Sequence, residues 1–155
     1  LSGPDLAPAP LLDEIDAVLD AIYEPINNGV YRAGFAGSQA AYDEAVGQLF
    51  EALDRWEAHL ERRPWLVGDH VTEADLCLFT TLVRFDSVYH THFKCNRRRV
   101  VDYPNLWAHT KRVYGLPGVA QTVDLDYIKA HYFGSHASIN PTGIVAVGPA
   151  LDFGA

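Results

Sequence analysis

The stretch "WLVGDHVTEADLCLFTTLVRF", Trp65 to Phe85, holds a turn, a helix start and a long apolar segment. Gly68 and Asp69 predict the turn. Thr72, followed three residues later by Asp75, has the form of a capping box with Asp in place of the usual Glu. The segment that follows is apolar on nearly every side, which is typical of a central, buried helix. We therefore expect a helix that begins after Thr72 and lies at the centre of the fold.

Two longer helical patterns precede this stretch. Apolar residues recur at three- and four-residue steps from Leu11 to Ile26, with acidic residues between them, which predicts an amphipathic helix. Asn27 to Gly29 tolerate the left-handed conformation of a helix C-cap, so we expect this helix to end there and the chain to turn. A second long helix is predicted from a cap at Ser38 to the "RRP" of Arg62 to Pro64.

Shorter helices are predicted in the remainder of the chain. One runs from about Asn105 to Tyr114, a short one follows Pro117, and Asp124 can cap another. The tail from Ser138 has no helical period. The sequence therefore predicts an all-α bundle with a non-helical C-terminal tail. We expect residues 1–10 to be a linker or cut end and residues 11–155 to form one helical domain.

Length and composition exclude several classes of function. The chain has 155 residues, about one domain, and a net charge of −8, which disfavours nucleic acid as a partner. No apolar run approaches the roughly 18 residues of a membrane span. The two cysteines form no C-x-x-C motif and no disulfide framework, so we expect a reducing, cytoplasmic setting.

The cysteines and histidines raise the question of a metal or a reactive thiol. Cys77 lies in the apolar segment and is expected to be an inert, buried thiol. Cys95 lies beside Lys94 and Arg97, whose charges could lower the pKa of its thiol, but no catalytic role is assigned to it. Together with His90 and His92 it could form a zinc cluster, but the closed spacing of a four-ligand site is missing, so no metal is predicted.

Charged residues interrupt the apolar segment and its neighbourhood. A charge at Arg84 requires a partner, for which Asp75 and Asp86 are candidates. The run from Arg97 to Arg99 is either a solvated face or a contact surface for acidic groups of a partner subunit or a further domain.

Two longer motifs carry a family resemblance. "WLVGDHVTEADLCLF" and "YPNLWAHTKRVYGLPGV" resemble the C-terminal helical domain of cytosolic glutathione transferases. "INNGVYRAGFA", "TLVRFDSVYHTHFKCNRR", "YPNLW" and "DYIKAHYFGSHASINPTGIVAVGP" are similar to the glutathionyl-hydroquinone reductases, the Xi class of that superfamily. This narrower resemblance covers nearly the whole chain, from about Ile22 to Pro149.

The resemblance implies a function and a set of partners. Members of this family are cytoplasmic dimers that remove glutathione, their co-substrate, from glutathionyl-hydroquinones. Their nucleophilic cysteine belongs to an N-terminal thioredoxin-like domain that is apparently absent from this chain, so an isolated copy is expected to be inactive. The helical half would supply the wall of the hydroquinone pocket. A conjugating glutathione transferase and a non-enzymatic helical interaction module are the alternatives.

The resemblance also points to three tyrosines. The "NGVY" match implies Tyr31 and the "HYF-x-SH" match implies Tyr132 as catalytic and substrate-binding residues, with Tyr127 as a weaker substrate-binding candidate. Phenol hydroxyls suit this task because they bond the oxygens of a hydroquinone and bring flat apolar rings. Judged from the residues alone, Tyr31 and Tyr132 are more often ordinary packed aromatics whose hydroxyls bond to the backbone.

Overall fold

The computed structural model describes residues 3–154, in which all regular structure is helical. The expectations for Leu1, Ser2 and Ala155 lie outside the described residues. The main helices are α1 (Leu12–Ile22), α2 (Gly29–Gly34), α3 (Gln39–Leu60), α4 (Glu73–Arg84), α5 (His90–His92), α6 (Pro104–Tyr114) and α7 (Leu125–Ser135). Short 3₁₀ turns are η1 (Ala9–Leu11), η4 (Val100–Asp102) and η5 (Ala120–Thr122), and π-helical turns are η2 (Tyr23–Asn27) and η3 (Phe85–Tyr89). The all-α prediction is confirmed.

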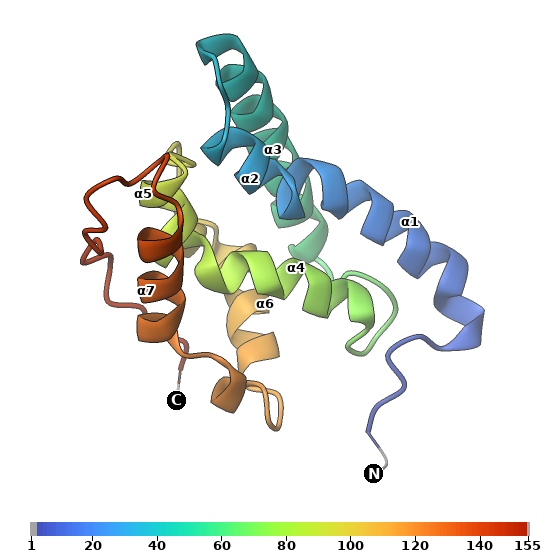
Figure 1. The fold of residues 1–155 in the computed structure, drawn as a ribbon. Coiled ribbons are helices and arrows are strands. Elements are labelled where there is room, and N and C mark those ends of the chain that lie inside the picture. Colours follow the sequence, from blue (N-terminus) through green and yellow to red (C-terminus); the bar gives the residue numbers. More distant parts are fainter. Residues whose placement is uncertain (1–2, 155) are drawn as a thin grey trace.

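Helix α4 crosses the middle of the molecule, with α1 and α3 on one side and α6 on another (Figure 1). Its start follows the predicted capping box: Asp75 Oδ2 accepts hydrogen bonds from the Thr72 N–H at 2.8 Å and the Thr72 hydroxyl at 3.1 Å. The predicted caps of α3 and α7 are also present. Ser38 Oγ accepts from Ala41 N–H at 3.2 Å, and Asp124 Oδ1 accepts from Tyr127 N–H at 2.9 Å.

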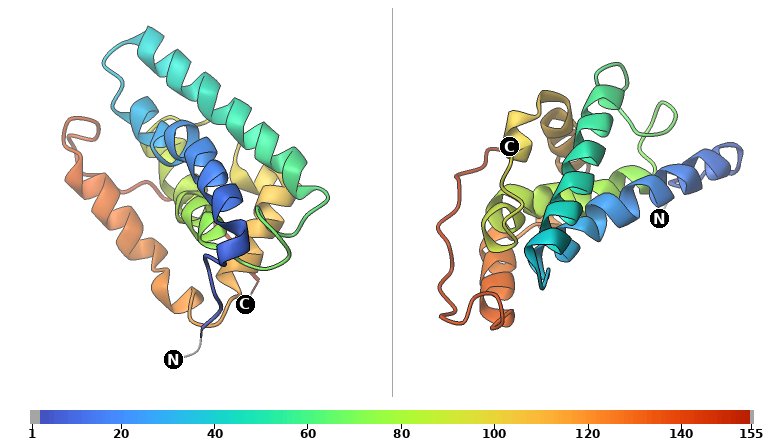
Figure 2. Two further views of the ribbon diagram at one scale, coloured as in Figure 1. Left: turned by 90° about the vertical axis from the view of Figure 1, so that its right-hand side faces the viewer. Right: turned by 90° about the horizontal axis from the view of Figure 1, so that it is seen from above.

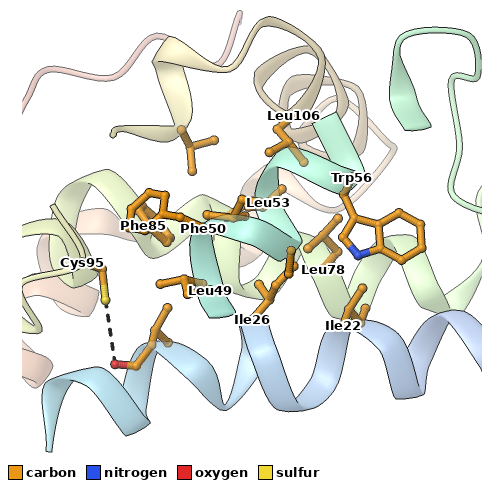
Figure 3. Close-up of a cluster of buried hydrophobic side chains, with 14 of the residues drawn as sticks. Ile22, Ile26, Leu49, Phe50, Leu53, Trp56, Leu78, Phe85, Cys95 and Leu106 are labelled. Carbon is orange, nitrogen blue, oxygen red and sulfur yellow. Dashed lines mark hydrogen bonds between the residues drawn. The ribbon is translucent and has the colours of Figure 1, made fainter. Parts of the chain in front are cut away.

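The main core lies where α1, α3 and α4 meet. Apolar side chains of these helices interdigitate with Phe85 and Leu106, as Figure 3 shows. Helix α4 is less enclosed than the sequence predicts, because Cys77 and Thr80 face outward. The prediction that Cys77 is buried is therefore wrong. It rested on the average apolar character of the segment, whereas an apolar face can also line a surface groove.

The helical run of α1 and η2 ends at Asn27 and Asn28 forms a turn before α2, as predicted, but the predicted left-handed cap is wrong. The chain stays right-handed there, with φ −83° and ψ −28° at Asn28, and continues through η2 into α2. Pro25 lacks the N–H that would bond one turn back, which favours a local departure from α-helical geometry. Gly29 lies against α3, where a Cβ would make an ordinary van der Waals contact 3.9 Å from Cβ of Leu49.

The tail is non-helical, as predicted, and returns across the outside of the molecule (Figure 2). Lys129 Nζ donates to the Val147 carbonyl at 2.6 Å, and the Asn140 amide donates to the Phe133 carbonyl at 2.8 Å. Phe153 then stacks on Tyr114 of α6, with ring centroids 4.7 Å apart. Among the helices described, none is long and apolar enough to cross a membrane.

Candidate active site

Two of the tyrosines singled out from the sequence meet in space. The Tyr31 hydroxyl on α2 lies 2.5 Å from the Tyr132 hydroxyl on α7, although 101 residues separate them in the chain. The Tyr132 hydroxyl also lies 2.9 Å from the hydroxyl of Tyr89 at the end of η3. Three segments therefore contribute to one hydrogen-bonded chain of phenols, which we call the tyrosine triad.

Sequence reasoning missed Tyr89. Its side chain is 2% exposed, and it follows Phe85 by four residues on the buried side of the continuation of α4. The available signal was chemical: a tyrosine in an apolar helical stripe needs a partner for its hydroxyl. The sequence contained no indication that this partner would be Tyr132.

Phe93 supports the rings of the triad. It is fully buried, and its ring lies 5.3 Å from Tyr31, 5.5 Å from Tyr89 and 6.1 Å from Tyr132, measured between centroids. Gly34 makes room for it, because a Cβ on Gly34 would lie 2.2 Å from Phe93 Cδ1. Aromatic packing of this kind holds the three hydroxyls in a fixed arrangement.

Tyr127 does not join this group. Its side chain is 70% exposed, and its ring lies against His131 with centroids 6.4 Å apart. Because Tyr127 and Tyr132 are five residues apart on α7, they lie on different faces of the helix. The structure therefore brings together two of the three tyrosines predicted from the sequence.

The triad lines a surface pocket of about 340 Å³, which we call the tyrosine pocket. Asn27, Thr80, Thr81 and Arg84 complete its wall. A larger groove of about 940 Å³ runs between α1 and α4 and shares Asn27 and Thr80 with it. The Asn27 amide fixes this shared edge by donating to the Thr81 hydroxyl and the Cys77 carbonyl, both at 2.8 Å. An elongated ligand in the groove could thus extend into the tyrosine pocket.

Burial and hydrogen bonding raise the pKa of two of the three phenols, Tyr89 and Tyr132. Burial, and next the hydrogen bond with Tyr31, raise the pKa of Tyr132 to about 12. Burial, and next the hydrogen bond with Tyr132, also raise the pKa of Tyr89 above its usual value. Neutral phenol hydroxyls can both donate and accept hydrogen bonds, so the pocket suits a ligand with oxygens on an aromatic ring.

The histidines near the pocket pair with each other. His92 Nε2 lies 3.0 Å from His136 Nδ1, and the two rings are stacked. Burial, and next the neighbouring His136, lower the pKa of His92. Within residues 3–154, no group of three or more His, Cys, Asp or Glu side chains is arranged to hold a metal ion.

The prediction of a lowered pKa at Cys95 is wrong. Its thiol is fully buried, with Sγ directed at the Val30 carbonyl 3.9 Å away (Figure 3), and burial raises its pKa to about 12. Lys94 and Arg97 are sequence neighbours whose side chains are exposed, so their charges do not offset the loss of solvent around the thiol. Cys77 lines the groove, and partial burial, and next Glu73, raise the pKa of its thiol.

The expected ion pair of Arg84 is also absent from the part of the chain that the structure describes. Both candidate carboxylates have other partners. Asp75 accepts from the His109 ring at 2.9 Å, and Asp86 accepts from the backbone N–H of Val100 at 2.6 Å. Arg97 to Arg99 are exposed, and Arg99 pairs with Asp102 at 2.9 Å.

The fold and its site define a class of protein. Residues 39–112 match the family model described as "Glutathione S-transferase, C-terminal domain". The chain is also 57% identical over 146 residues to glutathionyl-hydroquinone reductase PcpF of Sphingobium chlorophenolicum, covering 94% of this chain and 47% of that protein. It is 53% identical over 148 residues to glutathionyl-hydroquinone reductase YqjG of Escherichia coli, covering 96% of this chain and 45% of that protein.

Solved structures of similar proteins have the same fold as this chain. The glutathione-bound YqjG of Escherichia coli K-12 superposes with a TM-score of 0.96 at 51% identity, covering 98% of this chain and 50% of that one. The Xi class glutathione transferase of Natrialba magadii gives a TM-score of 0.97 at 51% identity, covering 99% and 47%. The chain has the fold of a glutathione transferase C-terminal helical domain and is similar to glutathionyl-hydroquinone reductases and Xi-class glutathione transferases. It spans about half the length of the curated relatives it matches.

Proposed function

We propose that this chain is the hydroquinone-binding half of a glutathione-dependent reductase that removes glutathione from glutathionyl-hydroquinones. The observation that carries the proposal is the tyrosine triad at the end of the groove, with hydroxyls 2.5 and 2.9 Å apart. Two oxygens on a ring require hydrogen-bond partners that neither ionise nor compete as nucleophiles at neutral pH, and buried phenols meet both requirements. The similar proteins of Sphingobium chlorophenolicum and Escherichia coli are named for the same reaction, which supports the proposal.

In this proposal the nucleophile comes from a thioredoxin-like domain outside this chain. A cysteine thiolate attacks the glutathione sulfur, the hydroquinone leaves, and a second glutathione resolves the mixed disulfide. The two cysteines of this chain are poor candidates because burial raises the pKa of both thiols and so disfavours the reactive thiolate. Tyr31 and Tyr132 would hold the ring oxygens, while Tyr89 holds Tyr132.

The setting of the reaction is part of the proposal. The groove between α1 and α4 would receive the glutathionyl part of the substrate beside the thioredoxin-like domain, with glutathione as co-substrate. A cytoplasmic homodimer follows from the family resemblance. The free state of Cys77 and Cys95 is compatible with a reducing compartment.

Kinetics of single hydroxyl deletions test this function. In the full-length protein, Tyr31→Phe and Tyr132→Phe should each lower kcat/KM for a glutathionyl-hydroquinone by about 10²-fold, because each removes a hydrogen bond or proton donor at the ring oxygens. Tyr127→Phe is the matched control: it removes the same group from an exposed ring of α7 and should leave kcat/KM unchanged. Normal rates in both pocket variants, with an intact fold by circular dichroism, would contradict the proposal.

The conjugating transferase differs in its activating residue and in its product. A cysteine opposite the glutathione sulfur supports reduction, whereas a serine or tyrosine there supports conjugation. Product analysis by mass spectrometry separates the two. The reductase yields free hydroquinone and glutathione disulfide, and a transferase yields a new thioether.

A further inference from the structure

Arg84, the last residue of α4, is the one charged side chain among the seven residues that line the tyrosine pocket. It lines the pocket together with Tyr31 on α2, Tyr89 on η3 and Tyr132 on α7. A guanidinium group is charged at every pH at which the protein is folded. The pocket therefore combines three neutral phenols with one permanent positive charge.

The charge of Arg84 is not neutralised by the neighbouring segments. Asp86 on η3 accepts from the backbone N–H groups of Val100 and Val101, and Glu24 on η2 lies 3.4 Å from Arg32. Lys129 on α7 donates to the Val147 carbonyl. Within residues 3–154, no ion pair includes Arg84.

The hydrogen bond that Arg84 makes within the chain uses few of the N–H donors of its guanidinium. Its Nη1 donates to the Thr80 carbonyl one turn earlier, an interaction that stabilises the C-terminal end of α4. A guanidinium has five N–H donors, so an interaction limited to the helix end leaves the others for a ligand. Burial and the Tyr31 hydrogen bond raise the pKa of Tyr132, and the charge of Arg84 opposes them by a smaller amount, so it acts on this hydroxyl of the pocket.

We propose that Arg84 is a substrate-binding residue of the tyrosine pocket that stabilises the ionised oxygen of a bound phenol. This inference rests on the proposed function and names the charge state of the ligand that the pocket favours. A phenolate oxygen accepts more strongly than a neutral phenol oxygen from both a tyrosine hydroxyl and the charged guanidinium. The ligand class is therefore a hydroquinone bound as its monoanion.

The proposed reaction forms such an anion. When a thiolate attacks the sulfur of the ketone tautomer of the substrate, a sulfur–sulfur bond forms as the carbon–sulfur bond breaks. The electron pair of the broken bond moves through the ring to its oxygen, so the hydroquinone leaves as a phenolate. A cation held beside that oxygen before the reaction favours this step without having to move.

The test uses 4-nitrophenol, whose absorbance changes when it ionises, bound to the full-length protein. We expect the pKa of the bound probe to lie about one unit below that of free 4-nitrophenol, because an opposite charge nearby favours the ionised form. Arg84→Gln should remove this shift and weaken phenolate binding about tenfold, while Arg84→Lys should keep most of it. Arg112→Gln is the matched control, since Arg112 on α6 also donates to a backbone carbonyl, that of Pro64 at 2.7 Å, outside this pocket.

The possible results separate failure of the role proposed for Arg84 from failure of the proposed function of the tyrosine pocket. A bound probe in the wild-type protein with the pKa of the free probe overturns the role of Arg84 without any variant. An unchanged shift in Arg84→Gln, or its equal loss in Arg112→Gln, also overturns it and leaves the proposed function standing. A wild-type protein that binds no 4-nitrophenol counts against the tyrosine pocket itself, and the inference then fails together with the proposed function.

Discussion

At the scale of single residues, Asp75 connects three parts of the molecule. Its carboxylate accepts from the Leu66 N–H at 2.9 Å, the Thr72 N–H at 2.8 Å and the His109 ring at 2.9 Å. Burial alone would raise the pKa of Asp75, but the hydrogen bonds from His109, Leu66 and Thr72 together lower it. The capping box was visible in the sequence, whereas its link to His109 on α6 was not.

Asp75→Ala should lower the free energy of unfolding by about 3 kcal/mol, because it leaves several buried donors without an acceptor. Denaturant titration measures this loss. Since the pKa of Asp75 is lower in the folded state, its contribution is present above the ordinary carboxyl pKa of about 4 and declines as the pH falls further. The difference between wild type and variant should therefore shrink below that pH.

Asp69→Ala provides the comparison. Asp69 also pairs with a histidine, His70 at 2.8 Å, but this pair is on the surface. Removal of the Asp69 carboxylate should leave the free energy of unfolding unchanged, because exposed ion pairs contribute little to stability. Equal losses in the two variants would show that the network around Asp75 is not the cause.

Residue-level prediction succeeded where local chemistry decides the outcome. Thr72 and Ser38 cap helices through contacts three residues away, so the sequence is sufficient to predict them. The exposure of Cys77, the burial of Cys95 and the role of Tyr89 depend on segments far away in the chain. Tyr31 and Tyr132 were identified from the family resemblance, and only the structure reports that their hydroxyls meet.

At the scale of elements, the two π-helical turns flank the tyrosine pocket. Turn η2 ends at Asn27, whose side-chain amide donates to the Thr81 hydroxyl on α4. Turn η3 ends at Tyr89, which belongs to the triad. A π-turn rotates the helix that follows it relative to the one before it, and such turns are frequent at functional sites. The sequence suggested a left-handed cap at Asn27 to Gly29 because Asn and Gly tolerate that conformation, but Asn28 here is right-handed.

Close packing of α2 on Phe93 can be tested with two glycines. Gly34→Ala should destabilise the protein by about 1–3 kcal/mol, because its Cβ would overlap the Phe93 ring that supports Tyr31. Gly47→Ala, in α3 with open space around the new Cβ, should stabilise it by about 0.5–1 kcal/mol through helix propensity. Thermal or denaturant unfolding gives both values, and shifts of the same sign would contradict this account of α2.

At the scale of the whole molecule, the pocket exists because α7 returns to the α4–α5 region. Tyr132 reaches Tyr31 and Tyr89 only from that position, and the tail then crosses to α6, where Phe153 stacks on Tyr114 (Figures 1 and 2). The sequence predicted a non-helical tail but no path for it, since a segment without periodicity carries no information about the surface it covers.

The central claim is that the tyrosine pocket holds the hydroquinone ring. A crystal structure of the full-length protein with a bound glutathionyl-hydroquinone tests it most directly. We expect a ring oxygen within about 3 Å of the Tyr31 or Tyr132 hydroxyl, the distance of a phenol hydrogen bond, with the glutathionyl part along the groove between α1 and α4. A ring that binds away from both hydroxyls, with the tyrosine triad unoccupied, would contradict the account.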